Sequence, residues 1–214
     1  MILGITGGIA TGKSTVSSLL QAIAEERGRP VAALSADAIA RDLLDPGTPA
    51  TLAVIEKFGQ SVTIDEEPDV LDRRALGSLI FSDDSSRRWL ENLLHPRIVE
   101  QLTESSTPFK GRRAEGRDGK SVLLMEIPLL FEANLEYLVD RVLVTTCPES
   151  LQLTRIMLRR QGTSETEAQR QINAQLPQET KIAKADFVIE TGKPVEAVRR
   201  ELGDVLDAVN SWRV

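Results

Sequence analysis

The chain has 214 residues, 41% of them hydrophobic and 27% charged, with a net charge of −6 and a pI near 5.0. This length suits one α/β domain with elaborations and is short for two independent domains. An acidic chain does not suit the non-specific grip on a phosphate backbone that nucleic-acid proteins use, so we expect no nucleic-acid partner.

A reducing compartment is expected, because the one cysteine, Cys147, cannot form an intramolecular disulfide. No apolar run reaches the roughly 18 residues of a membrane span, and no basic leader precedes the first apolar run. We therefore expect a cytoplasmic protein that has no membrane contact. Nothing in the chain indicates an obligate protein partner.

The N-terminal stretch contains a phosphate-binding loop pattern. An apolar run, Ile2 to Ile5, enters Gly7-x-x-x-x-Gly12-Lys13-Ser14, and a helix is predicted from about Lys13 to Arg27. In such a loop, backbone N–H groups and the helix N-terminus face phosphate oxygens. The expected nucleotide-binding residues are Gly8, Ile9, Ala10, Thr11, Gly12, Lys13, Ser14 and Thr15. Lys13 would reach the β- and γ-phosphates of ATP, and the Ser14 hydroxyl would ligate Mg²⁺.

The next segments predict a short buried strand at Val31–Leu34 and then a long helical region. From Pro49 to about Pro108 the pattern indicates helices and turns without strands. The helices are expected at 51–58, 72–81 and 85–94, with another after Pro96. We interpret residues 37–108 as a helical insertion that holds the acceptor substrate. The polar, Gly-containing stretch 104–120 is expected to be a surface loop, and its basic cluster to be solvated.

The rest of the chain alternates short apolar strands with helices. Strands are expected at 122–125, 141–146 and 186–190, and helices at 148–160, 164–175 and 194–212. This alternation predicts a doubly wound, five-stranded parallel sheet of the P-loop NTPase type. The expected organisation is one kinase domain, 1–214, whose core is 1–36, 121–147 and 184–214 and whose helical lid is 148–178.

Residues just past the strands are the candidates for chemistry, because ligands collect at the carboxyl ends of parallel strands. Asp37 follows the second strand and could accept a proton from an attacking hydroxyl, or it could cap the helix expected to begin near Ala38. Glu126 follows the third strand. It could serve the Mg²⁺ side of the site, or it could hydrogen-bond Ser14 or Thr15.

Paired arginines mark the expected lid. Arg155 and Arg159 are one helical turn apart and share a face, an arrangement that suits contact with a transferring phosphoryl group or, alternatively, a solvated helix face. The lone histidine, His95, precedes Pro96 and is read as a structural residue at a helix junction. Cys147 is read as a packed residue at a strand end.

Together these motifs resemble the dephospho-coenzyme A kinases of P-loop type, over almost the whole chain. The resemblance lies in five segments: Ile5–Val16, Ala36–Arg41, Leu94–Arg97, Ile127–Glu132, and Gln175 with Lys184–Ile189. It implies transfer of the ATP γ-phosphate to the ribose 3′-hydroxyl of dephospho-coenzyme A, with roles near the substrates for Asp37, Arg41, His95 and the lid arginines. Leu129, in the segment after the third strand, is a further candidate for substrate binding.

Three positions depart from the family pattern. Ala10 stands where a third glycine is common and should be tolerated unless the position needs a positive φ. Ser35 replaces a frequent acidic residue. The spacing at Arg159-Arg160 is one residue longer than in many members, so either arginine could make the lid contact.

Other functions remain as alternatives at this point. A P-loop kinase for a nucleoside, shikimate or gluconate would have the same phosphate loop. A GTP-driven switch protein would need an Asn-Lys-x-Asp motif, which the chain lacks, and an inactive scaffold fits poorly with intact Lys13, Ser14 and Asp37.

Overall fold

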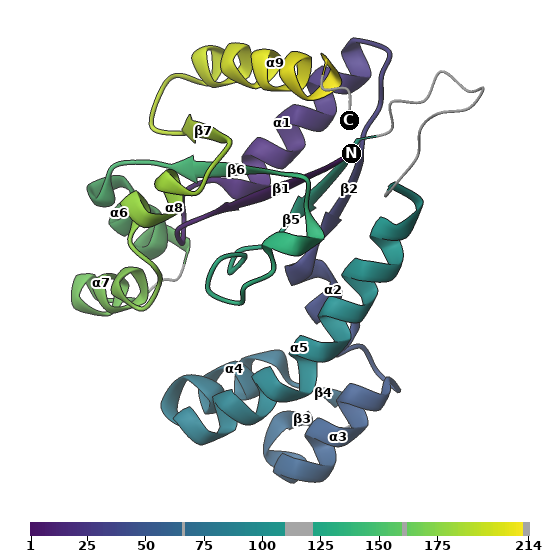
Figure 1. The fold of residues 1–214 in the computed structure, drawn as a ribbon. Helices are drawn as coiled ribbons and strands as arrows, with labels where there is room; N and C mark the ends of the chain where they lie inside the picture. The colour runs from purple at the N-terminus through teal and green to yellow at the C-terminus, as the bar shows by residue number, and fades with distance from the viewer. Residues whose placement is uncertain (66, 110–121, 160–161, 212–214) are drawn as a thin grey trace. The chain divides into compact units, whose positions relative to one another are not determined.

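The structure is a computed structural model that describes residues 1–65, 67–109, 122–159 and 162–211 (Figure 1). The chain forms two compact units. The first contains Met1–Ser35 and Ser106–Val214, and the second contains Ala36–Ser105. Each unit has its own apolar core, so each is described by itself.

The first unit is built on a five-stranded parallel sheet in the order β2-β5-β1-β6-β7, which confirms the predicted fold class. Its strands are β1 (Ile2–Gly7), β2 (Ala32–Ser35), β5 (Leu123–Glu126), β6 (Arg141–Thr146) and β7 (Phe187–Glu190). The chain leaves β1 for β2 and β5 on one side and then crosses to β6 and β7 on the other. The carboxyl end of β1 is therefore the topological switch point, where such sheets bind ligands.

Alternating side chains build the main core on one face of this sheet. Leu3 and Ile5 of β1 point to the same face because side chains alternate along a strand. Helices α1 (Lys13–Glu26) and α9 (Val195–Ser211) run side by side over that face and bury Leu20 and Leu202 against it (Figure 1). This packing holds the N-terminus of α1 next to the end of β1.

Three helices lie between β6 and β7 in the described part of the first unit. They are α6 (Glu149–Arg159), α7 (Glu165–Asn173) and α8 (Gln178–Ala183). The predicted helices at 148–160 and 164–175 correspond to α6 and α7, whereas the six-residue α8 was not expected. Ser164 caps α7 by accepting a hydrogen bond from the Glu167 N–H.

The second unit is mainly helical, with α2 (Ala36–Asp42), α3 (Pro49–Phe58), α4 (Arg73–Ser82) and α5 (Asp84–Ser106). The prediction that this region lacks strands was wrong. Strands β3 (Thr63–Ile64) and β4 (Glu67–Leu71) form an antiparallel pair, in which Leu71 is buried in the core of this unit. The pattern failed here because β3 has two residues and β4 begins with three exposed residues, Glu67, Pro68 and Asp69.

The predicted break at Pro96 was also wrong, because α5 continues through it. Proline removes one backbone donor from the helix and its ring crowds the preceding turn. The Arg97 guanidinium donates to the Leu93 carbonyl at 2.6 Å, in the turn that precedes Pro96. His95 therefore lies inside a helix and not at a junction between two.

Two smaller expectations also need correction. The second strand is not buried: β2 lies at the edge of the sheet, where Ala32 and Ala33 are exposed. Residues 104–106 belong to α5 and not to the expected loop, whereas positions 110–120 of that loop lie outside the described residues. Across the part of the chain that the structure describes, no helix combines the length and apolarity needed to cross a membrane.

Candidate active site

The phosphate loop folds as the glycine pattern predicts. After β1, the backbone has a positive φ at Gly7 (149°), Ala10 (60°) and Gly12 (89°), so the chain curls back before α1 begins. Gly12 is the N-cap of α1 and no side chain caps it. The N–H groups of the first turn therefore face the space that the loop encloses, where a phosphate would satisfy them.

Lys13 lies over this loop. Its ammonium donates to the Gly7 carbonyl at 3.1 Å and to the Gly8 carbonyl at 2.9 Å. These acceptors keep the charge close to the loop, where it can turn to a bound phosphate.

Ala10 occupies the conformation for which glycine is preferred. A left-handed φ costs an alanine about 1–2 kcal/mol. Its side chain is 4% exposed and packs against Ile156 of α6 and Ala168 of α7, an apolar contact that glycine could not make. Packing against the predicted lid thus offsets part of the strain.

Ser14 and Glu126 form an oxygen-rich pair beside the loop. The Ser14 hydroxyl donates to Glu126 Oε1 at 3.0 Å, and Glu126 is buried at the end of β5. This is the hydrogen bond expected under the second reading of Glu126, and it does not exclude the first. Hydroxyl and carboxylate oxygens suit Mg²⁺, which takes one or two protein ligands and completes its shell with water and phosphate. Within the described residues no group of three or more acidic, histidine or cysteine side chains forms a fuller metal cage.

The Arg155 side chain is hydrogen-bonded to the phosphate loop and to Thr191, the residue that follows β7. Its guanidinium donates to the Ala10 carbonyl at 3.1 Å, and to the Thr191 hydroxyl and carbonyl at 3.0 Å each. Arg159, one turn later, is exposed, and Arg160 lies outside the described residues. The two paired arginines therefore differ: one is bonded to backbone and one is open to solvent.

The candidate acceptor residues of the second unit are exposed. Asp37 lies in the first turn of α2, two residues beyond Ser35, which is paired in register with Glu126. Because α2 begins at Ala36, Asp37 is not at the N-cap, which removes the capping role considered for it. Arg41 is exposed and donates from Nε to the Asp37 carbonyl, and His95 is exposed on α5.

The substrate candidate Leu129 and the single cysteine, Cys147, lie in the first unit. Leu129 is a large apolar side chain with 41% exposure, which suits contact with a ligand. Cys147 is buried, and burial raises the pKa of its thiol, which makes it a weak nucleophile.

Two glutamine side chains are hydrogen-bonded to the backbone of the loop residue Ile9, a contact that was not predicted from the sequence. The Ile9 N–H donates to Gln175 Oε1 at 2.7 Å, and the Gln152 amide donates to the Ile9 carbonyl at 2.8 Å. Gln175 carried a signal, since it belongs to the segments that resemble the kinase family. Gln152 carried none beyond its position on α6.

Comparison with known proteins identifies the family of this chain. The model of one protein family, described as dephospho-CoA kinase, matches residues 1–196. A dephospho-CoA kinase from Halalkalibacterium halodurans is 37% identical over 214 residues, which cover 100% of this chain and 98% of the relative. Another, from Parasynechococcus marenigrum, is 45% identical over 88% of this chain and 86% of its own.

Two solved structures resemble the whole chain. A Thermus thermophilus protein has a TM-score of 0.72 at 31% identity, covering 97% of both chains. A dephospho-CoA kinase from Campylobacter jejuni has a TM-score of 0.64 at 27% identity, covering 97% of this chain and 96% of its own. The family match and the near full-length relatives together show that the chain belongs to the dephospho-CoA kinase family.

Proposed function

We propose that this chain transfers the γ-phosphoryl group of ATP to the ribose 3′-hydroxyl of dephospho-coenzyme A, giving coenzyme A and ADP in the last step of coenzyme A biosynthesis. The observation that carries the proposal is the family match over residues 1–196, a range that includes the phosphate loop and the segments Ala36–Arg41 and Ile127–Glu132. ATP is the donor that the family uses.

On the donor side, Lys13 leaves the Gly7 and Gly8 carbonyls and offsets charge on the β- and γ-phosphates. The N–H groups of the loop and of the first turn of α1 donate to the same phosphate oxygens. Residues Gly8–Thr15 thus form the nucleotide cradle.

Ser14 and Glu126 would hold Mg²⁺, with Ser14 as a direct ligand and Glu126 acting through water. When bound, the cation neutralises charge on the phosphate oxygens.

On the acceptor side, the carboxylate of Asp37 takes the proton of the 3′-hydroxyl as its oxygen attacks the γ-phosphorus and the bond to ADP breaks. Arg41, His95 and Leu129 contact dephospho-coenzyme A, the last through its exposed apolar side chain. Arg159, and Arg155 where the lid rearranges, bring positive charge to the transferred group.

For the organisation of the chain, we retain a core of 1–36, 121–147 and 184–214, an acceptor region of 37–108 and a lid of 148–178. Support comes from the compactness of Ala36–Ser105 and from the contact of α6 and α7 with the phosphate loop.

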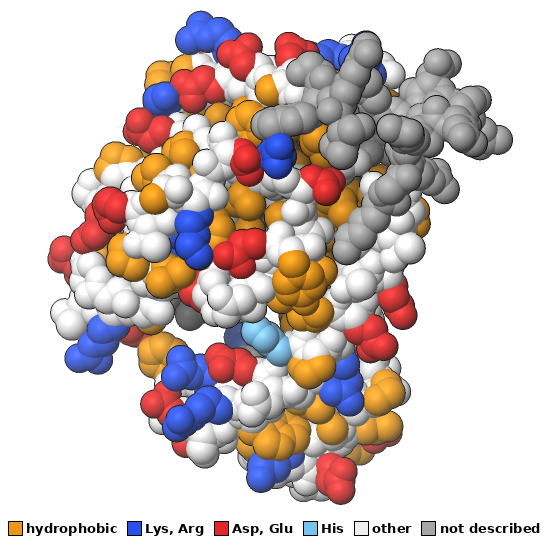
Figure 2. Space-filling view, viewed as in Figure 1, with side chains coloured by type: hydrophobic (Ala, Val, Ile, Leu, Met, Phe, Trp, Pro, Cys, Tyr) orange, Lys and Arg blue, Asp and Glu red, His pale blue; other side chains and the backbone are white. Residues whose placement is uncertain are grey.

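We propose small-molecule partners without nucleic acid, and a cytoplasmic location. Among the described residues on the face shown in Figure 2, Lys and Arg side chains are interspersed with Asp and Glu. Cys147 is present as a buried free thiol, which fits a reducing compartment.

The proposal is tested by the choice of acceptor. The purified protein is given Mg-ATP with dephospho-coenzyme A, adenosine, AMP, shikimate or gluconate, and ADP release is followed by a coupled assay. Dephospho-coenzyme A should have a kcat/KM several orders of magnitude above the others, because its pantetheine arm adds binding energy that orients the hydroxyl. Faster phosphorylation of shikimate, gluconate or adenosine would overturn the acceptor assignment.

A further inference from the structure

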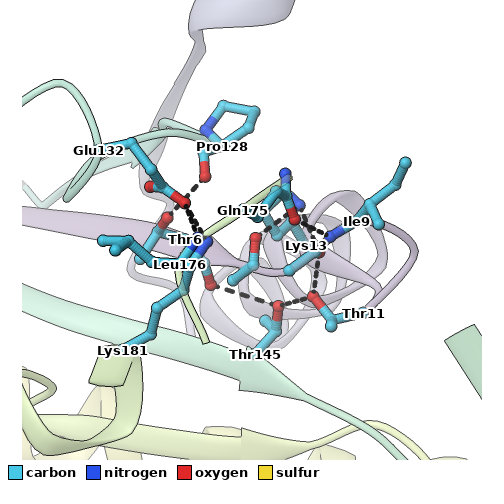
Figure 3. Close-up of polar contacts among 12 residues, drawn as sticks. Thr6, Ile9, Thr11, Lys13, Pro128, Glu132, Thr145, Gln175, Leu176 and Lys181 are labelled. Atoms are coloured by element: carbon cyan, nitrogen blue, oxygen red, sulfur yellow. Dashed lines mark hydrogen bonds and ion pairs between the residues drawn. The ribbon is translucent and has the colours of Figure 1, made fainter. Parts of the chain in front are cut away.

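Buried hydroxyl groups connect the phosphate loop to the segment Pro128–Glu132, here called the acceptor segment. Thr11 and Thr145 share a hydrogen bond of 2.7 Å between their hydroxyls, and Thr145 also contacts the Thr6 carbonyl at 3.3 Å. The Thr6 hydroxyl donates to the Pro128 carbonyl at 3.1 Å (Figure 3). All three threonines are fully buried. These hydrogen bonds thus connect Thr11 of the phosphate loop to Pro128, the first residue of the acceptor segment.

A second connection starts at Ile9, on the other side of the loop. Gln152 and Gln175 hold the Ile9 peptide by its carbonyl and by its N–H (Figure 3 draws the Gln175 contact). The next residue, Leu176, donates its N–H to Glu132 Oε1 at 3.2 Å. Glu132 ends the acceptor segment, so this connection reaches the other end of the same segment.

Glu132 also neutralises a buried lysine. Lys181 of α8 is 0% exposed, and its ammonium lies 2.7 Å from Glu132 Oε1. Burial alone would raise the pKa of the Glu132 carboxyl, but Lys181 and the backbone N–H groups hold the pKa below its ordinary value. A buried ammonium is costly unless it is paired, so Glu132 stabilises Lys181 in its buried position on α8.

We propose that Glu132 is a positioning residue for the phosphoryl transfer, acting with Lys181 and Gln175 to fix the acceptor segment against the phosphate loop. The inference rests on the proposed function, since the acceptor segment matters only if it contacts dephospho-coenzyme A. Its physical basis is the steep dependence of transfer on alignment: a displacement of about 1 Å costs roughly 100-fold in rate. Two hydrophobic side chains could fill the volume of the Glu132–Lys181 ion pair, but they would not accept a hydrogen bond from the Leu176 N–H.

Two double variants separate positioning from stability. Glu132→Gln with Lys181→Met removes both charges but keeps an oxygen that can accept from the Leu176 N–H. Glu132→Ala with Lys181→Met removes both charges and that acceptor as well. Melting temperature, kcat per folded molecule and KM for each substrate are measured for both.

We expect the Gln/Met variant to keep kcat within about fivefold of wild type, and the Ala/Met variant to lose roughly 100-fold in kcat with smaller changes in either KM. If the pair served stability alone, kcat per folded molecule would be the same in both variants. Equal kcat values would therefore overturn the proposal, whatever the melting temperatures.

The Ile9 connection is tested with a matched pair of glutamines. Gln175→Ala removes the acceptor for the Ile9 N–H and should lower kcat about 10-fold or more, as losses in supporting contacts around a site do. Gln169→Ala is the control, because Gln169 lies on α7 and its amide bonds to Glu149 and Asn173. Equal kcat values in the two variants would contradict a role for this connection.

A nucleotide-binding measurement keeps the inference separate from the proposed function. If wild-type protein fails to phosphorylate dephospho-coenzyme A, the proposed function is wrong. The network of contacts from Ile9 through Gln175 and Glu132 to Lys181 is then tested by the rise in melting temperature that Mg-ATP produces. That rise should be smaller in the Ala/Met variant than in the Gln/Met variant, because a loosened loop binds nucleotide less well. Equal rises would refute the network on its own.

Discussion

Replacing Gly7 by alanine tests whether the phosphate loop is as tightly seated as the structure indicates. A Cβ at this position would lie 2.4 Å from the Thr145 carbonyl oxygen, 2.4 Å from its hydroxyl and 2.8 Å from the Thr11 hydroxyl. The position also has a φ of 149°, which side chains rarely adopt. The backbone oxygen belongs to a central strand, so it cannot move aside without disturbing the sheet.

The magnitude follows from two contributions. Overpacking a well-filled site costs about 1–3 kcal/mol, and a disfavoured backbone conformation costs about 1–3 kcal/mol more. Together these give roughly 2–6 kcal/mol, or a fall of roughly 4–24 °C in melting temperature at about 2–4 °C per kcal/mol for a chain of this size. Turnover should fall with it, because the loop must shift away from the position that holds the phosphates.

Gly28→Ala is the matched control. Gly28 has a φ of 67°, but nothing lies within 4 Å of the Cβ it would gain. Backbone strain in the variant costs about 1–2 kcal/mol, and restriction of the unfolded chain returns about 0.4–1 kcal/mol. The free energy of unfolding should therefore fall by about 1 kcal/mol. Both variants are followed by circular dichroism melts and by the ADP-release assay. If Gly7→Ala lost no more stability than Gly28→Ala and kept its turnover, the packing described around Gly7 would be wrong.

Four further outcomes are expected. Lys13→Ala should stay folded by circular dichroism but lose orders of magnitude in kcat/KM, because the phosphate charge is no longer offset; near-normal turnover would contradict its role. Asp37→Asn should lower kcat by about 10²–10⁴, the usual span for a general base, with little change in KM or melting temperature. A large drop in melting temperature with unchanged kcat would make Asp37 structural. Arg159→Ala should lower kcat by roughly 10- to 1000-fold with ATP affinity nearly intact, whereas Arg155→Ala should lower melting temperature and ATP affinity, since that side chain bonds to the loop backbone. The reverse assignment would show that Arg155 carries the phosphoryl contact. The pKa of Glu132 is lowered in the folded protein, so its contribution to stability is present above the unfolded pKa, about 4.5, and is lost as pH falls through the folded value. The melting temperature should therefore fall less steeply between about pH 7 and pH 3 in a variant in which Glu132 and Lys181 are both replaced by neutral residues.

The sheet and the phosphate loop were predictable because their signals are local. Short apolar runs alternating with helical periods give parallel strands, and the spacing from Gly7 to Ser14 gives the loop. The hairpin of the second unit was not predictable on these grounds, because Thr63–Ile64 is too short to show a period. The continuity of α5 through Pro96 was not predictable either, because a proline within a helical pattern usually ends or kinks the helix.

The residues of the site likewise fall into those with a local sequence signal and those that depend on tertiary contacts. Lys13, Ser14 and Glu126 follow from the loop pattern and from the ends of strands, and the structure brings Ser14 and Glu126 together. The strain at Ala10 could be posed from sequence but not decided, because it depends on a backbone angle. The contacts that join Ile9, Gln175, Glu132 and Lys181 span four separate segments, and no spacing rule relates them.

The most direct test of the assignment is the identity of the product. Wild-type protein is incubated with Mg-ATP and dephospho-coenzyme A, and the product is analysed by ³¹P NMR and by chromatography against authentic coenzyme A. We expect ADP and coenzyme A in equal amounts, with the new phosphate on the ribose 3′-oxygen, and no product from Lys13→Ala. ATP consumption without coenzyme A, or a phosphate on another oxygen, would contradict the assignment.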